Sequence, residues 1–163
     1  MATQVQFRRG TTSQHGSFTG AVGEVTVDTD KDTVVVHDGS QAGGFAIPNL
    51  KTAQEFTKTQ NFNATTLTDA STIAWDASSN QVAKVTLGGN RTLGAATNQV
   101  DGAVYVLTVI QDGSGSRTLS FNSNYKFTGG SAPTLTTTAS AKDVIVFLSN
   151  GSNMLEIGRS LNV

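Results

Sequence analysis

The sequence lacks cysteine altogether, and only 14% of its 163 residues are charged. Without cysteine there are no disulfides, thiolate metal sites or thiol nucleophiles. The same absence is compatible with assembly in a reducing cytoplasm. No apolar run approaches the roughly 20 residues that a membrane span needs, and residues 1–10 contain no apolar signal core. We therefore expect a protein that is made in a cytoplasm and is not inserted into a membrane.

Basic charge is also scarce. The formal net charge is −1, and Arg8-Arg9 is the one adjacent basic pair. The electrostatic signature of a nucleic-acid-binding protein is therefore absent, and we expect no nucleic-acid partner. Threonine, serine, glycine and asparagine occupy much of the remaining sequence, a composition that favours strands and turns over solvated helices.

Residues 1–48 read as a small β module. Val5 and Phe7 alternate with polar residues in an extended arm, and Thr11 offers a helix cap before a short helical turn. Segments 24–28 and 33–37 are rich in β-branched residues and predict a hairpin. A short edge strand follows and ends at Pro48, because proline cannot donate a ladder hydrogen bond.

Residues 49–70 read as a connector, and residues 71–163 as a distal β domain. Strands at 103–110 and 143–148 are apolar on both faces, which predicts that they lie inside a sandwich or an oligomer. Asn150-Gly151 predicts a hairpin between the second of these strands and the next. We expect an all-β chain whose distal domain is a β-sandwich or jelly-roll rather than a parallel sheet.

Catalytic chemistry has few candidate residues. His37 precedes Asp38, but no convincing third partner accompanies this pair or His15, so turn-stabilising hydrogen bonds are the favoured interpretation. A glycan hydrolase needs paired carboxylates, whereas the glutamates at 24, 55 and 156 are far apart in sequence. We expect no enzymatic activity and no cofactor.

An acidic stretch at 28–32 resembles the start of a calcium loop. The EF-hand pattern needs glycine at its sixth position and glutamate at its twelfth, and this sequence has Thr33 and Gly39 there. An acidic hairpin turn is the favoured interpretation, and we expect no metal site.

Two aromatic residues are candidates for glycan contact. Trp75 and Tyr125 can stack on sugars if they are exposed, or pack in the core, and the core is the favoured alternative. Tyr105 lies in a doubly apolar strand and is expected to be structural.

Several segments resemble bacteriophage proteins. The pattern QFRRGTT at 6–12, FTG at 18–20, GEVTVDT at 23–29 and VVHDG at 35–39 resembles the N-terminal module of phage tropism-determinant and tail-fibre proteins. The pattern VTL at 85–87, NRTL at 90–93, QDG at 111–113, RTL at 117–119 and YKF at 125–127 resembles a β-rich domain of phage fibre and virion proteins. The resemblance implies a trimeric virion protein, made in the host bacterial cytoplasm, whose N-terminal module forms an intertwined base.

Self-association is also indicated by the two doubly apolar strands, the few charged residues and the thin connector, because copies of such a chain can bury each other's apolar surfaces. The arginines at 8 and 9 can bind a neighbouring subunit or remain solvated. The expected oligomer and anchor residues are Val5, Phe7, Arg8, Arg9, Phe18, Val25, Val27, Val34, Val36 and Phe45.

Two virion roles compete. The first is a capsid decoration protein or head fibre that contacts the major capsid protein and aids weak, multivalent host adhesion. The alternative is a tail-fibre or receptor-binding subunit that recognises a host surface polysaccharide. Tropism determinants also have a large lectin-like domain, for which this chain is too short, and this favours the capsid role.

Overall fold

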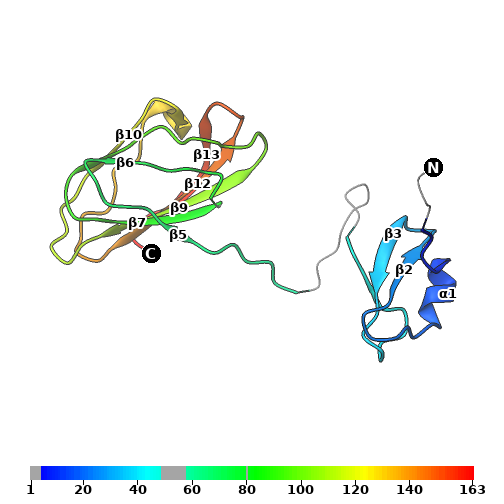
Figure 1. The fold of residues 1–163 in the computed structure, drawn as a ribbon. Helices are drawn as coiled ribbons and strands as arrows, with labels where there is room; N and C mark the ends of the chain where they lie inside the picture. Colours follow the sequence, from blue (N-terminus) through cyan, green and yellow to red (C-terminus); the bar gives the residue numbers. More distant parts are fainter. Residues whose placement is uncertain (1–4, 49–57, 80) are drawn as a thin grey trace. The chain divides into compact units, whose positions relative to one another are not determined.

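The computed structural model describes residues 5–48, 58–79 and 81–163 (Figure 1). The chain divides into two compact units, residues 1–60 and 61–163, and each is described by itself. Residues 49–57, the first part of the predicted connector, lie outside the described residues. Its last part belongs to the second unit, where Thr65–Thr66 form strand β5 and Leu67 is buried in the core.

The N-terminal unit is a small sheet with one short helix beside it. Its strand order is β1 (Arg9–Gly10), β2 (Val25–Asp28), β3 (Thr33–Val36) and β4 (Phe45–Ala46). β2 and β3 form an antiparallel hairpin, which confirms the predicted one, and β1 runs parallel to β2. Helix α1 (Thr12–Gly16) starts at a capping box, in which the Thr11 side chain and Gln14 satisfy each other's backbone N–H groups.

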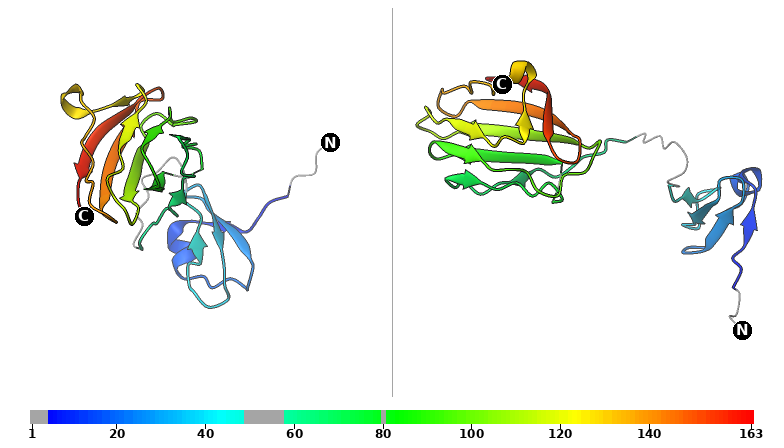
Figure 2. Two further views of the ribbon diagram at one scale, coloured as in Figure 1. Left: turned by 90° about the vertical axis from the view of Figure 1, so that its left-hand side faces the viewer. Right: turned by 90° about the horizontal axis from the view of Figure 1, so that it is seen from above.

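The second unit consists of two facing sheets. The larger sheet has the order β11 (Tyr125–Lys126), β13 (Met154–Ser160), β12 (Lys142–Ser149), β9 (Val104–Gln111), β7 (Val82–Leu87) and β5. The smaller sheet has the order β10 (Leu119–Phe121), β8 (Arg91–Leu93) and β6 (Thr72–Ile73). Figure 2 shows the strands of the larger sheet side by side. A short 3₁₀ turn covers Thr128–Gly130.

The expectation against parallel pairing is wrong for part of this unit. From β5 to β10 the chain alternates between the larger and the smaller sheet. Consecutive strands of one sheet are therefore separated by a crossover through the other sheet, and they run in the same direction. As a result β5, β7 and β9 are parallel, and so are β6, β8 and β10. The all-β prediction is confirmed.

The core lies between the two sheets. The inward residues of β7, β9 and β12 meet Ile73, Leu93 and Leu119 from the smaller sheet. The Asn150-Gly151 hairpin is confirmed: β12 and β13 pair in antiparallel fashion, and Gly151 adopts the positive φ of 81° that such a turn needs. A register shift next to Val146 displaces Ile157 from the regular ladder.

Candidate oligomer interface

The β2–β3 hairpin has an inverted pattern of burial. Its valines at 25, 27, 34 and 36 are half-buried or exposed, whereas the polar residues Thr26, Asp28 and Thr33 are buried. Helix α1 lies beside the polar face, and its His15 is buried there. The face with the higher content of aliphatic side chains is therefore the one that this unit leaves uncovered.

The strand register places the uncovered aliphatic side chains on one face. Val25 pairs with Val36 and Val27 with Val34, and directly paired residues project to the same side. Val36 also pairs with Phe45, and Ile47 donates its backbone N–H to Val34 across the same edge. We call this set the anchor face: Val25, Val27, Val34, Val36, Phe45 and Ile47. Phe45 is 56% and Ile47 51% exposed, which is high for side chains of this size.

The opposite, buried face is held by a chain of hydrogen bonds through two histidines. Gly20 donates its N–H to Nδ1 of His37 at 3.3 Å, and Nε2 of His37 lies 2.9 Å from Oγ1 of Thr26. The same hydroxyl lies 2.8 Å from Nε2 of His15, whose Nδ1 lies 3.0 Å from the carbonyl oxygen of Thr11. A backbone N–H can only donate and a carbonyl can only accept. With both rings neutral, every bond in this His15–Thr26–His37 relay then has one donor and one acceptor.

Two glycines allow the backbone to pass close to His37. A Cβ at Gly20 would lie 2.5 Å from Cγ of His37. A Cβ at Gly44 would lie 2.8 Å from Nδ1 of the same ring, and Gly44 has a φ of +58°. Neither position accepts a larger residue without displacing the imidazole.

Asp28 ties the start of the helix to the hairpin turn. Its carboxylate accepts hydrogen bonds from the Thr12 hydroxyl at 2.7 Å and from the backbone N–H groups of Asp30 and Lys31. Burial by itself raises the pKa of this carboxyl, but these hydrogen bonds outweigh it and lower the pKa below its usual value of 3.8. The acidic stretch therefore acts as a turn that is stabilised within the chain.

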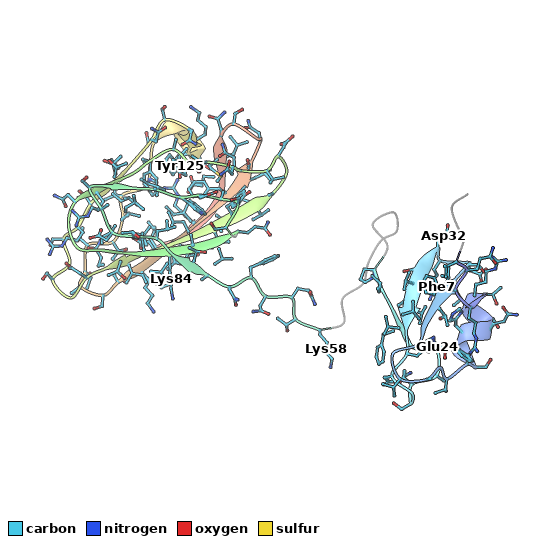
Figure 3. All side chains as sticks on the ribbon, viewed as in Figure 1. Phe7, Glu24, Asp32, Lys58, Lys84 and Tyr125 are labelled. Carbon is cyan, nitrogen blue, oxygen red and sulfur yellow. The ribbon has the colours of Figure 1, made fainter. Side chains whose placement is uncertain are left out.

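The predicted anchor residues of the N-terminal arm divide between the two faces. Val5 is 77% and Phe7 58% exposed, and Figure 3 labels Phe7 beside the small sheet. Arg9 pairs with Val27 in the parallel register, so its side chain projects on the side of the anchor face. Arg8 instead forms an ion pair with Glu24 at 2.9 Å and lies 4.9 Å from the ring of Phe18.

Phe18 is an internal contact of the unit as well. Its ring meets the edge of His37 at 5.2 Å, on the side of the sheet that holds the helix. A hollow of about 240 Å³ lies there, lined in part by Arg8, Gln14 and His15. The polar groups of these three residues already bind Glu24, Thr11 and the relay, respectively. The structure thus assigns Arg8 and Phe18 contacts within the unit, away from the anchor face.

The His37–Asp38 pair of the sequence is not a pair in space. Asp38 accepts hydrogen bonds from the backbone N–H groups of Ser40 and Gln41 at 2.9 and 2.8 Å, which stabilises the turn, while His37 belongs to the relay. The hydrogen bonds to Ser40 and Gln41 lower the pKa of the Asp38 carboxyl. Among residues 5–48, 58–79 and 81–163, no group of three or more His, Asp or Glu side chains is placed to hold a metal ion.

The candidate glycan contacts Trp75 and Tyr125 need correction. Trp75 is 2% and Tyr125 4% exposed, so neither ring offers a face to a sugar. Trp75 packs edge-on against Tyr105 at 6.0 Å, and Tyr125 packs against Phe121 and Phe147. Burial also raises the pKa of the Tyr125 hydroxyl. Both residues are core residues, because their side chains belong to the hydrophobic cluster of the second unit.

Sequence reasoning missed two features of this unit. Ile47 follows Phe45 by two positions in an alternating strand, and this spacing could have placed it on the anchor face. His15 and His37 share the hydroxyl of Thr26 as a hydrogen-bond partner. The only local indication of this in the sequence is Thr26 itself, a polar residue at an inward position between two outward valines.

Two family models match the chain. The first, described as the major tropism determinant N-terminal domain, matches residues 5–41. The second, described as a putative phage tail fibre C-terminal domain, matches residues 69–154, which is more than half of the chain. The chain belongs to this phage tail fibre family. A tail fibre protein is a component of the virion, and this places the chain among bacteriophage structural proteins.

A curated relative and solved structures resemble this tail fibre chain. The tail fiber receptor-binding protein of Bordetella phage BPP-1 is 41% identical over 155 residues, which cover 88% of this chain and 36% of that protein. The chain thus spans about a third of the length of this relative. The Major Tropism Determinant I1 variant is 69% identical over 28% of this chain and 12% of its own, with a TM-score of 0.27. The U1 variant is 31% identical over 88% of this chain and 38% of its own, with a TM-score of 0.30.

The relatives favour one of the two expected virion roles. They are tail-fibre and receptor-binding proteins, and they support the tail-fibre alternative better than capsid decoration or a head fibre. The short length of the chain had favoured the capsid role, and these matches outweigh that argument. In the part of the chain that the structure describes, no helix is long and apolar enough to cross a membrane.

Proposed function

We propose that this chain is a non-enzymatic tail-fibre subunit that assembles with copies of itself and takes part in host recognition. The observation that carries the proposal is the anchor face. Six aliphatic or aromatic side chains lie together on one side of a small sheet, while the polar side of the same sheet is buried. A free-standing unit gains nothing from this inversion, because apolar burial is the main driving force of folding.

The proposed assembly is a homotrimer in which anchor faces cover one another. Closed symmetry buries every copy of the face and leaves no unpaired surface that could continue into a filament. The face contains no acidic side chain, and Arg9 lies at its edge. Identical faces therefore meet without repulsion between carboxylates, and Val5 and Phe7 of the arm extend the apolar area.

Host recognition is proposed from the relative, whose name describes a receptor-binding protein. A trimer multiplies weak contacts with a repetitive surface polysaccharide, because the second and third contacts form at high effective concentration. Trp75 and Tyr125 are buried, so the proposal places any glycan contact at other residues. No cofactor is included in the proposal.

The assembly is tested by light scattering of the full chain at micromolar concentration. We expect the mass of three copies for the native sequence and a shift toward one copy for Val27→Glu and Val34→Glu. These variants place carboxylates on the anchor face without touching the relay. Thr19→Glu, at an exposed position of the same unit, is the matched control and keeps the native mass. A single-copy mass for the native chain contradicts the proposal.

The virion role is tested with antibodies against the chain on intact phage particles. Gold label at the tail supports a tail-fibre subunit, whereas label spread over the capsid supports the decoration role and overturns the proposal. Electron cryomicroscopy of the same particles then counts copies at each fibre.

A further inference from the structure

The turn that joins β12 to β13 contains the only asparagine of the chain that is followed directly by a glycine, Asn150-Gly151. Such a pair can deamidate without an enzyme, because glycine has no side chain to hinder the approach of its backbone nitrogen to the asparagine amide. Figure 1 shows the two strands that this turn connects. Asn150 is exposed, so water reaches the turn. The turn is therefore a candidate site of chemical modification.

The reaction forms one bond and breaks another at the amide carbon of Asn150. The backbone nitrogen of Gly151 loses its proton and bonds to Cγ of Asn150. The bond from Cγ to Nδ2 then breaks, and Nδ2 leaves as ammonia together with that proton. Water opens the resulting cyclic imide at either of its two carbonyl groups. One opening gives aspartate, and the other gives isoaspartate, in which the backbone runs through the side-chain carbon.

Two backbone N–H groups point at the oxygen of the Asn150 amide. Ser152 donates to Oδ1 at 3.2 Å, and Asn153 donates to the same atom at 2.7 Å. Negative charge develops on this oxygen when a nucleophile attacks Cγ, and donors that are already in place stabilise such charge. The backbone N–H of Asn150 also donates to the carbonyl oxygen of Asn153 at 3.1 Å, which closes the turn. The turn thus holds the amide carbon in a polarised state that favours attack.

The attacking nitrogen, in contrast, is occupied. Gly151 donates its backbone N–H to Oγ of Ser149 at 3.0 Å. Ser149 is only 1% exposed, so water does not compete for this hydroxyl. Its backbone is fixed as well, because its N–H donates to Ala103 and its carbonyl oxygen accepts from Gly102, each at 2.9 Å. The hydrogen bond keeps the proton on the Gly151 nitrogen and must break before that nitrogen can attack.

We propose that Asn150 is a latent deamidation site and that the hydroxyl of Ser149 suppresses the reaction while the second unit is folded. The two donors on Oδ1 favour the attack, so the occupied N–H of Gly151 is the feature that opposes it. The inference does not depend on self-association or on host recognition, because every residue that carries it lies in or next to one turn.

The two products have different consequences for the hairpin. Aspartate keeps an oxygen in the place of Oδ1, so the N–H groups of Ser152 and Asn153 retain their acceptor. Isoaspartate lengthens the backbone of the turn, and the paired residues that flank the turn, Ser149 and Met154, are both buried. We therefore expect isoaspartate to disrupt the end of the hairpin and aspartate to be tolerated there.

The test follows deamidation of Asn150 over time in the full chain, by mass spectrometry of its peptides. We expect the folded native chain to react at least about fivefold more slowly than the same chain in urea, the factor that corresponds to the net contribution of one hydrogen bond. Ser149→Ala removes the acceptor and should react at least about fivefold faster than the native chain in buffer. Ser149→Thr keeps a hydroxyl and is the matched control, for which we expect the native rate.

Internal references separate the chemistry from a loss of structure. Asn90 lies in the same unit and is followed by Arg91, so its slower deamidation should be unchanged in all three chains. Hydrogen exchange at the backbone N–H groups of Ser149 and Gly102 shows whether the end of β12 stays paired. Fluorescence of Trp75, the only tryptophan, shows whether the second unit is still folded.

Several results would overturn the inference. Equal rates in buffer and in urea for the native chain would mean that the folded turn gives no protection. An unchanged rate in Ser149→Ala, or an equally fast reaction in Ser149→Thr, would mean that the hydroxyl does not oppose the attack. A faster reaction in Ser149→Ala that is accompanied by faster exchange at Ser149 and Gly102 would assign the effect to loosening of the strand. The mass measured by light scattering tests the proposed function separately from all of these results.

Discussion

At the scale of single residues, the hydroxyl of Thr26 connects the two buried histidines of the N-terminal unit. Oγ1 of Thr26 lies within hydrogen-bond distance of both imidazoles, and Thr26 is only 1% exposed. A buried hydroxyl at this position is useful because it donates to one ring and accepts from the other. The relay therefore connects β2, the residue that follows β3, and α1.

Thr26→Val tests the relay with little change in side-chain volume. The substitution leaves Nε2 of both histidines without a partner, and each buried unsatisfied group costs about 1–3 kcal/mol. We expect the free energy of unfolding of the N-terminal unit to fall by at least this amount. His15 and His37 are the only histidines, so their ring NMR signals during urea unfolding report on this unit alone.

The matched control is Thr19→Val at an exposed position of the same unit. It is expected to leave the urea midpoint unchanged, and the Trp75 signal of the second unit should be unchanged in both variants. Equal midpoints for Thr26→Val and the native chain would show that the relay contributes no stability.

At the scale of elements, Asp28 joins the first turn of α1 to the turn between β2 and β3. The pKa of its carboxyl is lower in the folded unit than its usual value of 3.8, mainly because hydrogen bonds from Thr12 and two backbone N–H groups outweigh the effect of burial. A carboxyl with a lowered pKa binds protons more readily in the unfolded chain. Its contribution to stability is therefore complete above pH 3.8 and is lost as the pH falls through the folded-state value.

Acid titration of the N-terminal unit checks this sign. We expect the free energy of unfolding, followed by the histidine ring signals, to decrease as the pH falls below about 4. Asp28→Asn should lower the stability at neutral pH and flatten this acid limb. Asp76→Asn, which removes a carboxyl with a lowered pKa in the other unit, should leave the acid limb unchanged. An equally steep acid limb in Asp28→Asn would assign the effect to other carboxyls.

At the scale of the whole molecule, each unit has one covered and one uncovered face. The second unit covers the inner face of its larger sheet with β6, β8 and β10, and the N-terminal unit covers its polar face with α1. Exposed apolar patches of several hundred Å² are uncommon on solitary proteins and indicate interaction sites. The proposed self-association through the anchor face predicts that the stability of the chain depends on its concentration.

The midpoint of thermal unfolding measures this dependence of stability on protein concentration. Because assembly favours the folded chain by mass action, the midpoint should rise as the protein concentration is raised over about two orders of magnitude. The anchor-face variant Val27→Glu should show a smaller rise than the native chain, with Thr19→Glu as the control. A midpoint that is independent of concentration in the native chain would mean that the folded units are stable as single copies.

Local patterns were sufficient for the parts of the fold that depend on neighbouring residues. The alternation in β2 and β3, the doubly apolar β9 and β12, and the Asn150-Gly151 turn are all readable from spacing, because strand geometry has a period of two. The same alternation places the valines at 25, 27, 34 and 36 on one side of the hairpin. The all-β class followed from these local signals.

Tertiary structure decided which face of each strand is covered and by what. The parallel pairing of β5, β7 and β9 arises because the chain crosses to the other sheet between them, and no local pattern records such a crossover. The burial of Trp75 and Tyr125 and the meeting of His15 with His37 depend on contacts between distant segments. The sequence determined the two faces of each strand, whereas long-range pairing determined which of them became the core.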